Sequence, residues 1–229
     1  MPRALDEAMA RQFARYRQAR REGMPRAGWK ICVNDPVAQH HLGLDGSFVG
    51  FLDGRRALAS GATYRIPPTT RLAVEAEVAL RIGAQVPACA AVDEARRAIA
   101  AASPSLELVD YALASRDLAR IAETASFHHG FVLGNERSPQ SAPRVRADCP
   151  SLRINDAVTG PADARLVPED LAVLVVLVAR FLDRFDERLE AGDWILCGSC
   201  VRPAFVAAGD EVNADFGPLG VVSATFAEG

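Results

Sequence analysis

Residues 71–80 read RLAVEAEVAL, in which side chains alternate in a way typical of a β-strand. Prolines at 67 and 68 and a glycine at 83 bound it, so we predict a strand over residues 70–83. Successive side chains of a strand point to opposite faces. One face would be apolar and pack into the core, and it comprises Leu72, Val74, Ala76, Val78 and Leu80. The other face would carry Glu75, Glu77 and Ala79.

Glu75 and Glu77 would therefore lie close together on one face. Like charges at that separation repel, and the pKa values of the two carboxyl groups diverge unless a cation lies between them. Oxygen-only ligation by carboxylates suits Mg²⁺ or Mn²⁺. Glu107, flanked by leucines in the apolar stretch SLELVDY, is the natural third ligand. The alternative on spacing alone is that Glu75 and Glu77 line the solvated face of an edge strand.

The remaining segments predict a mixture of helices and strands. Helices are expected over residues 4–21, 93–102, 117–124 and 168–189, and strands over 28–33, 104–111, 131–134, 150–155, 194–201, 209–217 and 220–226. Residues 34–56 are turn-rich. We see no internal repeat and no linker, which favours one α+β fold: an N-terminal helical segment over residues 1–27, then a single catalytic domain over 28–229.

Composition excludes several classes of protein. Apolar residues make up 49% of the 229 residues, enough to fill a core, and the net charge is −3, so no basic field is available for nucleic acid. The longest apolar run, LAVLVVLVA at 171–179, is too short to cross a bilayer, which needs roughly 20 residues. The charged N-terminus has no signal-peptide core. We expect a soluble, cytoplasmic protein.

One lysine, Lys30, stands among 26 basic residues, the rest being arginines. A chain with this bias would keep a lysine where a compact amine that can lose its proton is needed; the alternative is a chance surface residue. The five cysteines include a C-x-x-C at Cys197 and Cys200, without a second pair at zinc-finger spacing. We interpret these two as small buried thiols.

Several stretches, taken in order, resemble the 2-keto-4-pentenoate hydratase and 4-oxalocrotonate decarboxylase group of the fumarylacetoacetate hydrolase superfamily. They are GWKICV (28–33), HLGLDGSFVGFL (41–52), VEAEVAL (74–80), SLELVDY (105–111), TASFHHGFVLG (124–134) and GDWILCGSCVRPAFVAAGDEVNADFGPLGVVSATF (192–226). The resemblance thus covers about residues 28 to 226. It implies the fold of that superfamily, a mixed β-roll or sandwich with flanking helices.

The resemblance also implies a mechanism. Mg²⁺ or Mn²⁺ held by Glu75, Glu77 and Glu107 would chelate a small 2-oxo or 2-hydroxydienoic acid and polarise its C2 oxygen. Lys30 would orient a carboxylate or carry a proton to the dienol carbon. Ser126 and Ser199 would donate hydrogen bonds to the substrate. The group implies a homo-oligomer as well, and this chain starts roughly a helix later than typical members, which would trim a subunit contact.

Two departures from the group's pattern bear on the reaction. Phe48 stands where an aspartate is often found, which removes a candidate for activating water. The segment TASFHH has Thr124 in place of asparagine, and a histidine pair where small residues are usual. One of these histidines could take over acid–base work, and His129 is our candidate. Because neighbouring residues on a strand point opposite ways, at most one of the pair faces the site.

The leading functional hypothesis is a lyase that hydrates a 2-hydroxy-2,4-dienoate to a 4-hydroxy-2-oxo acid. The second is decarboxylation of a 4-oxalocrotonate-like diacid. Phe48 mildly favours this reaction, because decarboxylation needs no residue that activates water. Arg202 could bind the second carboxylate of the diacid, or it could equally be a surface residue. Hydrolysis of acylpyruvates is less favoured, because no His-Glu pair precedes the metal strand. A non-catalytic partner subunit of the same fold is the alternative from another class.

Overall fold

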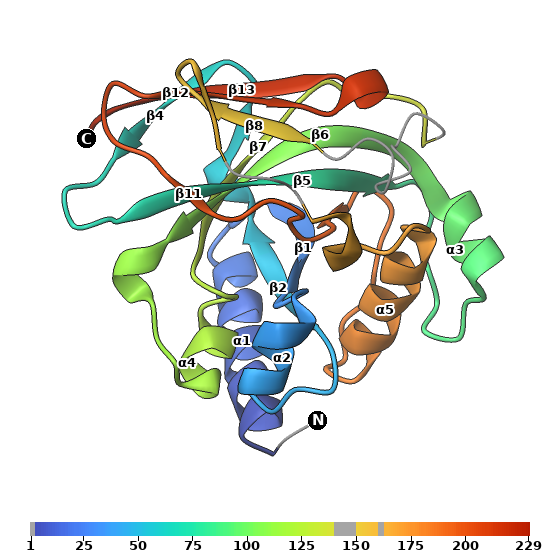
Figure 1. The fold of residues 1–229 in the computed structure, drawn as a ribbon. Helices are drawn as coiled ribbons and strands as arrows, with labels where there is room; N and C mark the ends of the chain where they lie inside the picture. The colour runs from blue at the N-terminus through green and yellow to red at the C-terminus, as the bar shows by residue number, and fades with distance from the viewer. Residues whose placement is uncertain (1–2, 140–149, 160–162) are drawn as a thin grey trace.

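The structure, a computed structural model, describes residues 3–139, 150–159 and 163–229, and it contains two mixed β-sheets with helices around them (Figure 1). The helices are α1 (Arg3–Arg21), α2 (Pro36–His41), α3 (Val92–Ala98), α4 (Leu118–Glu123) and α5 (Ala172–Asp183). The strands are β1 (Arg26–Cys32), β2 (Phe48–Asp53), β3 (Ala57–Ala59), β4 (Ala62–Ile66), β5 (Leu72–Ile82), β6 (Ile99–Asp110), β7 (His128–Leu133), β8 (Ser151–Ile154), β9 (Ala157–Val158), β10 (Trp194–Leu196), β11 (Ala204–Phe205), β12 (Glu211–Asp215) and β13 (Val221–Glu228). The predicted α+β class is confirmed.

The larger sheet runs in the order β2-β1-β10-β5-β6-β7-β3, with β11 also paired to β5. Strand β5 lies in its middle, antiparallel to both β10 and β6. The alternative of a solvated edge strand is therefore wrong. The predicted alternation is confirmed, because the five apolar residues from Leu72 to Leu80 belong to the main core, while Ala79 packs in a small second cluster on the opposite face.

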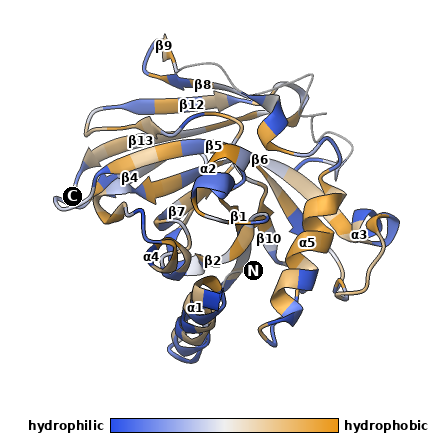
Figure 2. Cartoon of the chain, turned by 60° about the horizontal axis from the view of Figure 1, so that its bottom comes forward, coloured by the Kyte–Doolittle hydropathy of each residue, from blue (hydrophilic) through white to orange (hydrophobic). Residues whose placement is uncertain are grey.

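The smaller sheet runs in the order β4-β13-β12-β8-β9, and Figure 1 shows it above β5 and β6. Helices α1, α2, α4 and α5 lie on the other side. Helix α5 is predominantly hydrophobic (Figure 2) and buried on several sides, as its sequence predicts. None of the helices in the described part of the chain has the length and apolar character that a membrane crossing requires.

Helix α1 buries one face, as the spacing of its apolar residues predicts. Met9, Phe13 and Tyr16 are buried, and both aromatic rings pack against Trp29 of β1. Helix α1 thus contributes to the same core as the strands, and the division of the chain at residue 27 stays a prediction.

A buried carboxylate joins the start of β1 to the start of β10. Asp193 accepts hydrogen bonds from Arg26 Nε at 2.6 Å and Nη2 at 2.7 Å, and from Trp29 Nε1 at 3.0 Å. The two strands approach so closely that a Cβ on Gly28, whose φ is +125°, would lie 2.0 Å from the carbonyl oxygen of Trp194. Only glycine fits there. This junction fixes β1, and with it Lys30, in the sheet.

The structure corrects four predicted segments. Helix α3 ends at Ala98, and residues 99–102 belong to β6, because pairing with β5 outweighs the helix propensity of the alanines. Residues 34–56 include α2, with Asp35 as its N-cap, and β2. Helix α5 covers only Ala172–Asp183 of the predicted 168–189. Strand β10 stops at Leu196, before the positive φ of Gly198 turns the chain.

Candidate metal centre

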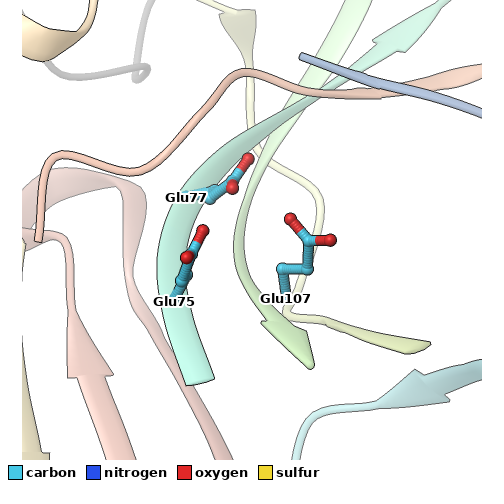
Figure 3. Close-up of side chains that lie close together, drawn as sticks. All are labelled: Glu75, Glu77 and Glu107. Atoms are coloured by element: carbon cyan, nitrogen blue, oxygen red, sulfur yellow. The ribbon is translucent and has the colours of Figure 1, made fainter. Parts of the chain in front are cut away.

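Three carboxylates converge from the two central strands (Figure 3). Glu75 and Glu107 are directly opposite each other in the antiparallel pair of β5 and β6. Glu77 lies one step along the same face of β5, opposite Ser105. Each of the three glutamates offers an oxygen, and these oxygens lie within 4.8 Å of one another. The structure thus brings together the predicted metal-ligating residues from segments that lie apart in the sequence.

The carboxyl groups of this cluster lie in a poorly solvated place. Glu77 and Glu107 are buried, and Glu75 is partly exposed. Burial, and then the charge of Glu107, raise the pKa of Glu75 from 4.5 to about 7. The same two causes raise the pKa of Glu77 well above its ordinary value. Like charges directly opposite on neighbouring strands are destabilising, so the cluster favours a proton or a cation between its oxygens.

Lys30, on β1, is buried and donates a hydrogen bond from Nζ to Oε1 of Glu107. Burial alone would lower the pKa of this amine, but the negative charges around it, Glu107 foremost, raise its pKa above the ordinary value. Burial alone would likewise raise the pKa of Glu107, but Lys30 and His128 hold it below its ordinary value. Lys30 is therefore not a surface residue, and in the absence of an ion it is a cation paired with Glu107.

Two carboxylate oxygens of the cluster differ in their hydrogen-bond partners. Glu77 Oε2 accepts a hydrogen bond at 2.7 Å from the backbone N–H of Gly198. Glu107 Oε2 is buried and has no hydrogen-bond partner among the described residues. A buried carboxylate oxygen without a donor is costly unless a cation coordinates it. Three carboxylates and an unpartnered oxygen fit a hard divalent cation such as Mg²⁺ or Mn²⁺.

The loop after β10 positions the groups around Glu77. Ser199 Oγ donates hydrogen bonds to the carbonyl oxygens of Ala76 at 3.2 Å and of Val201 at 2.8 Å. Its hydroxyl is therefore already engaged with the backbone. Cys197 and Cys200 are both buried, as predicted. Sequence reasoning missed the Gly198 N–H contact, because the donor belongs to the backbone and no side chain marks it.

A cavity of about 800 Å³ opens onto the cluster. Glu75, Glu77 and Lys30 line it on one side, and the predicted substrate-binding residues Ser126, Ser199 and Arg202 also line it. Arg202 is exposed and has no partner within residues 3–139, 150–159 and 163–229. The cavity thus combines two carboxylates and the amine of the cluster with two arginines, Arg165 and Arg202. Phe48, by contrast, is fully buried in the core.

The histidine pair does not lie as we expected. His128 Nδ1 lies 2.9 Å from Glu107 Oε1. His129 instead hydrogen-bonds through its ring to Tyr64 and Arg56, and the structure does not bring it to the glutamates. The histidine at the cluster is His128.

A β-bulge explains the exchange of the two histidines. On β6, Leu108 pairs with Gly130 but Val109 pairs with His128, so β7 has one extra residue at His129. Paired residues share a face, so His128 lies on the face of Val109 and Glu107. Without the bulge, His129 would lie there. A one-residue shift of register moves every following side chain to the other face.

The turn that precedes β7 is unusual. Ala125, Ser126 and Phe127 all have positive φ, between 50° and 65°. Non-glycine residues seldom adopt this conformation, and a run of three is held here by hydrogen bonds from Ser126 N to Ile121 O at 2.7 Å and from Asp110 N to Phe127 O at 3.0 Å. The turn directs Ser126 to the cavity and feeds His128 into the sheet.

Comparison with known proteins identifies relatives over most of the chain. A family described as "Fumarylacetoacetate (FAA) hydrolase C-terminal" matches residues 33–227. The protein named 2-keto-4-pentenoate hydratase 1 from Dechloromonas aromatica is 28% identical over 226 residues, which cover 97% of this chain and 86% of the relative. A second protein of that organism, 2-keto-4-pentenoate hydratase 2, is 27% identical over the same shares. The predicted resemblance is therefore confirmed.

Solved structures share the fold. The 4-oxalocrotonate decarboxylase from Pseudomonas putida, complexed with magnesium and adipate, superposes with a TM-score of 0.85 at 21% identity, covering 97% of this chain and 86% of the other. A fumarylpyruvate hydrolase from Pseudomonas aeruginosa, in complex with Mn²⁺ and pyruvate, gives a TM-score of 0.70 at 17% identity, with coverage of 90% and 91%. These likenesses confirm the predicted fold type.

Proposed function

The chain belongs to the fumarylacetoacetate (FAA) hydrolase family, and on that premise we propose that it is a metal-dependent lyase that hydrates a 2-hydroxy-2,4-dienoate to a 4-hydroxy-2-oxo acid. The observation that carries the proposal is the cluster of three glutamates, in which Glu107 Oε2 is buried and unpartnered among the described residues and Glu75 and Glu77 line the cavity. Relatives named as hydratases over nearly the whole chain support the reaction.

In this proposal Glu75, Glu77 and Glu107 hold Mg²⁺ or Mn²⁺, and Lys30 orients the substrate or donates a proton to it. The bound ion would supply Lewis acidity toward the carboxylate and C2 oxygen of the substrate. Lys30 lines the cavity and is positively charged, so it can attract the anionic substrate and hold its carboxylate. Its alternative role is that of proton donor to the dienol carbon, because the amine lines the same cavity.

Hydration proceeds in two steps: a proton shift that turns the dienol into a 2-oxo-3-enoate, and then the addition of one water molecule. The 2-hydroxyl of the dienol loses a proton and the terminal carbon gains one, with Lys30 Nζ as the candidate donor. Water then adds across the remaining carbon–carbon double bond, giving a hydroxyl at the distal carbon and a new C–H next to the 2-oxo group. Ser126, at the cavity wall, is the candidate donor to the substrate. Ser199 is less suited, because its hydrogen is engaged with the backbone.

A spectrophotometric assay tests the proposal. With Mg²⁺ and 2-hydroxypentadienoate, the ultraviolet band of the diene should disappear and a 4-hydroxy-2-oxo acid should form. Glu77→Gln should abolish both turnover and calorimetric Mg²⁺ binding, whereas Glu94→Gln, at an exposed position, should change neither. Unchanged affinity in Glu77→Gln would remove the metal site. Persistence of the diene band with dienoates and 4-oxalocrotonate alike, while metal binding is normal, would support the non-catalytic reading.

Decarboxylation of a 4-oxalocrotonate-like diacid is the second candidate. The observation in its favour is Arg202, an arginine without a partner in the described part of the chain, on the wall of the same cavity. In this case Arg202→Gln should raise KM for 4-oxalocrotonate by 10-fold or more, about 1.4 kcal/mol, and leave KM for a monocarboxylic dienoate unchanged. Equal effects on both substrates would count against a diacid.

A further inference from the structure

We infer that His128 is a positioning residue for the metal ligand Glu107: its Nδ1–H orients the carboxylate so that Oε2 is left for the cation. The inference rests on the proposed metal site and concerns a residue of this chain that does not touch the cation. It follows from three observations: the hydrogen bond, the unpartnered oxygen, and the position of the imidazole outside the substrate cavity.

The hydrogen bond fixes which nitrogen carries the hydrogen. As a ligand of a divalent cation Glu107 is a carboxylate, so its oxygens only accept hydrogen bonds. His128 Nδ1, 2.9 Å from Oε1, must therefore be the donor. The side chain of His128 is 5% exposed, so water has little access to compete for this hydrogen bond.

Both donors converge on the same oxygen of Glu107. Lys30 Nζ and His128 Nδ1 each bond Oε1, and they approach from different strands, β1 and β7. Oε2 receives no donor among the described residues. A carboxylate pinned through one oxygen by two donors cannot rotate to exchange its oxygens without breaking both bonds. The arrangement therefore assigns Oε1 to the protein and Oε2 to the cation.

His128 acts through Glu107 rather than on the substrate. The described residues that line the cavity of about 800 Å³ include Lys30, Glu75 and Glu77 but neither Glu107 nor His128. His128 instead lines a separate hollow of about 680 Å³, together with His129, Arg56 and Asp110. The imidazole thus contacts Glu107 from outside the substrate cavity, which suits a group that orients a ligand without touching the substrate.

The chain offers a matched set of variants. In His128→Asn the amide Nδ2 can replace the Nδ1–H donor, whereas His128→Leu removes it at similar volume. Hydrogen-bond partners of metal ligands typically contribute 10–100-fold to affinity. We expect His128→Leu to raise the Kd for Mn²⁺, measured by calorimetry without substrate, by about 10-fold or more. His128→Asn should stay within about threefold of the wild-type protein. His129→Ala, on the adjacent residue that faces away, should bind as the wild-type protein does.

The outcomes separate this inference from the metal site itself. Normal Mn²⁺ binding by the wild-type protein with an unchanged Kd in His128→Leu would overturn the positioning role alone. Equal losses in His128→Leu and His128→Asn would also overturn it, because the donor would then not be the cause. Failure of the wild-type protein to bind Mn²⁺ would overturn the proposed site and the inference with it. If His128→Leu does not fold, His128→Gln, which moves the donor outward by one bond, takes its place with the same expected loss.

Discussion

In the metal-free protein, Glu75→Gln is expected to raise the melting temperature at pH 8. Burial beside Glu107 raises the pKa of Glu75 from 4.5 in a solvated chain to about 7 in the folded protein. The folded state therefore holds the proton up to a higher pH than the unfolded state does. Between pH 4.5 and 7 the folded state binds more protons, so rising pH lowers the free energy of unfolding through this group. Glutamine has no such titration.

The shift sets the size of the effect. At pH 8 the displaced pKa of Glu75 reduces the free energy of unfolding by about 3 kcal/mol, and at pH 5 by about 1 kcal/mol. For a chain of this length, each kcal/mol changes the melting temperature by roughly 2–4 °C. The variant should therefore melt roughly 6–12 °C above the wild-type protein at pH 8, and only a few degrees above it at pH 5.

Thermal unfolding in EDTA at the two pH values measures this difference, with Glu94→Gln, at an exposed position, as the control. Saturating Mg²⁺ should then stabilise the wild-type protein and leave Glu75→Gln almost unchanged, because binding to the folded state alone adds stability. A variant that is no more stable than the wild-type protein at pH 8, or whose advantage is equal at pH 5 and pH 8, would refute the reasoning.

Three other predictions concern the metal and the sheet. Because Glu75 and Glu77 must lose their protons before they bind a cation, the affinity for Mg²⁺ should fall at least about tenfold from pH 8 to pH 6, by calorimetry; a flat profile would contradict this. Asp193→Ala removes the buried acceptor of the partly exposed Arg26 and should lower the free energy of unfolding in urea by about 2–3 kcal/mol, and a loss below about 1 kcal/mol would be inconsistent with a structural ion pair. Gly28→Ala should lower it by at least about 2 kcal/mol, since the new Cβ meets the Trp194 carbonyl; wild-type stability would show that the strands can separate.

The sequence alone predicted the parts of the site that depend on the two-residue alternation of side chains along a strand. Two glutamates two residues apart in an alternating strand share a face wherever that strand lies, and Glu107 between leucines indicates a charged group in a buried strand. The register that sets Glu75 opposite Glu107 is a property of the pair β5 and β6, and the sequence pattern does not contain it. Family resemblance supplied that link.

The histidine pair shows the limit of reasoning from local period. Alternation correctly predicted that only one of the two faces the site, but the bulge at His129 decides which one. The bulge adds one residue to β7 after a turn of three left-handed residues, none of them glycine. No turn signal marks such a segment, because glycine or asparagine would ordinarily be expected there. Tertiary pairing decided residues 99–102 in the same way, by extending β6 against β5 over alanines that favour a helix.

The location of the cluster explains how the fold tolerates it. Opposed carboxylates weaken a strand pair, yet Glu75 and Glu107 stand in the longest ladder of the sheet, which continues from Leu72 opposite Asp110 to Ile82 opposite Ile99. The apolar face of β5 buries its side chains in the main core on the opposite side. Repulsion on one face is thus offset by burial on the other, and the strands cannot separate to relieve it. A cation is the remaining means of relief, so the same rigidity that supports the charges also favours metal binding.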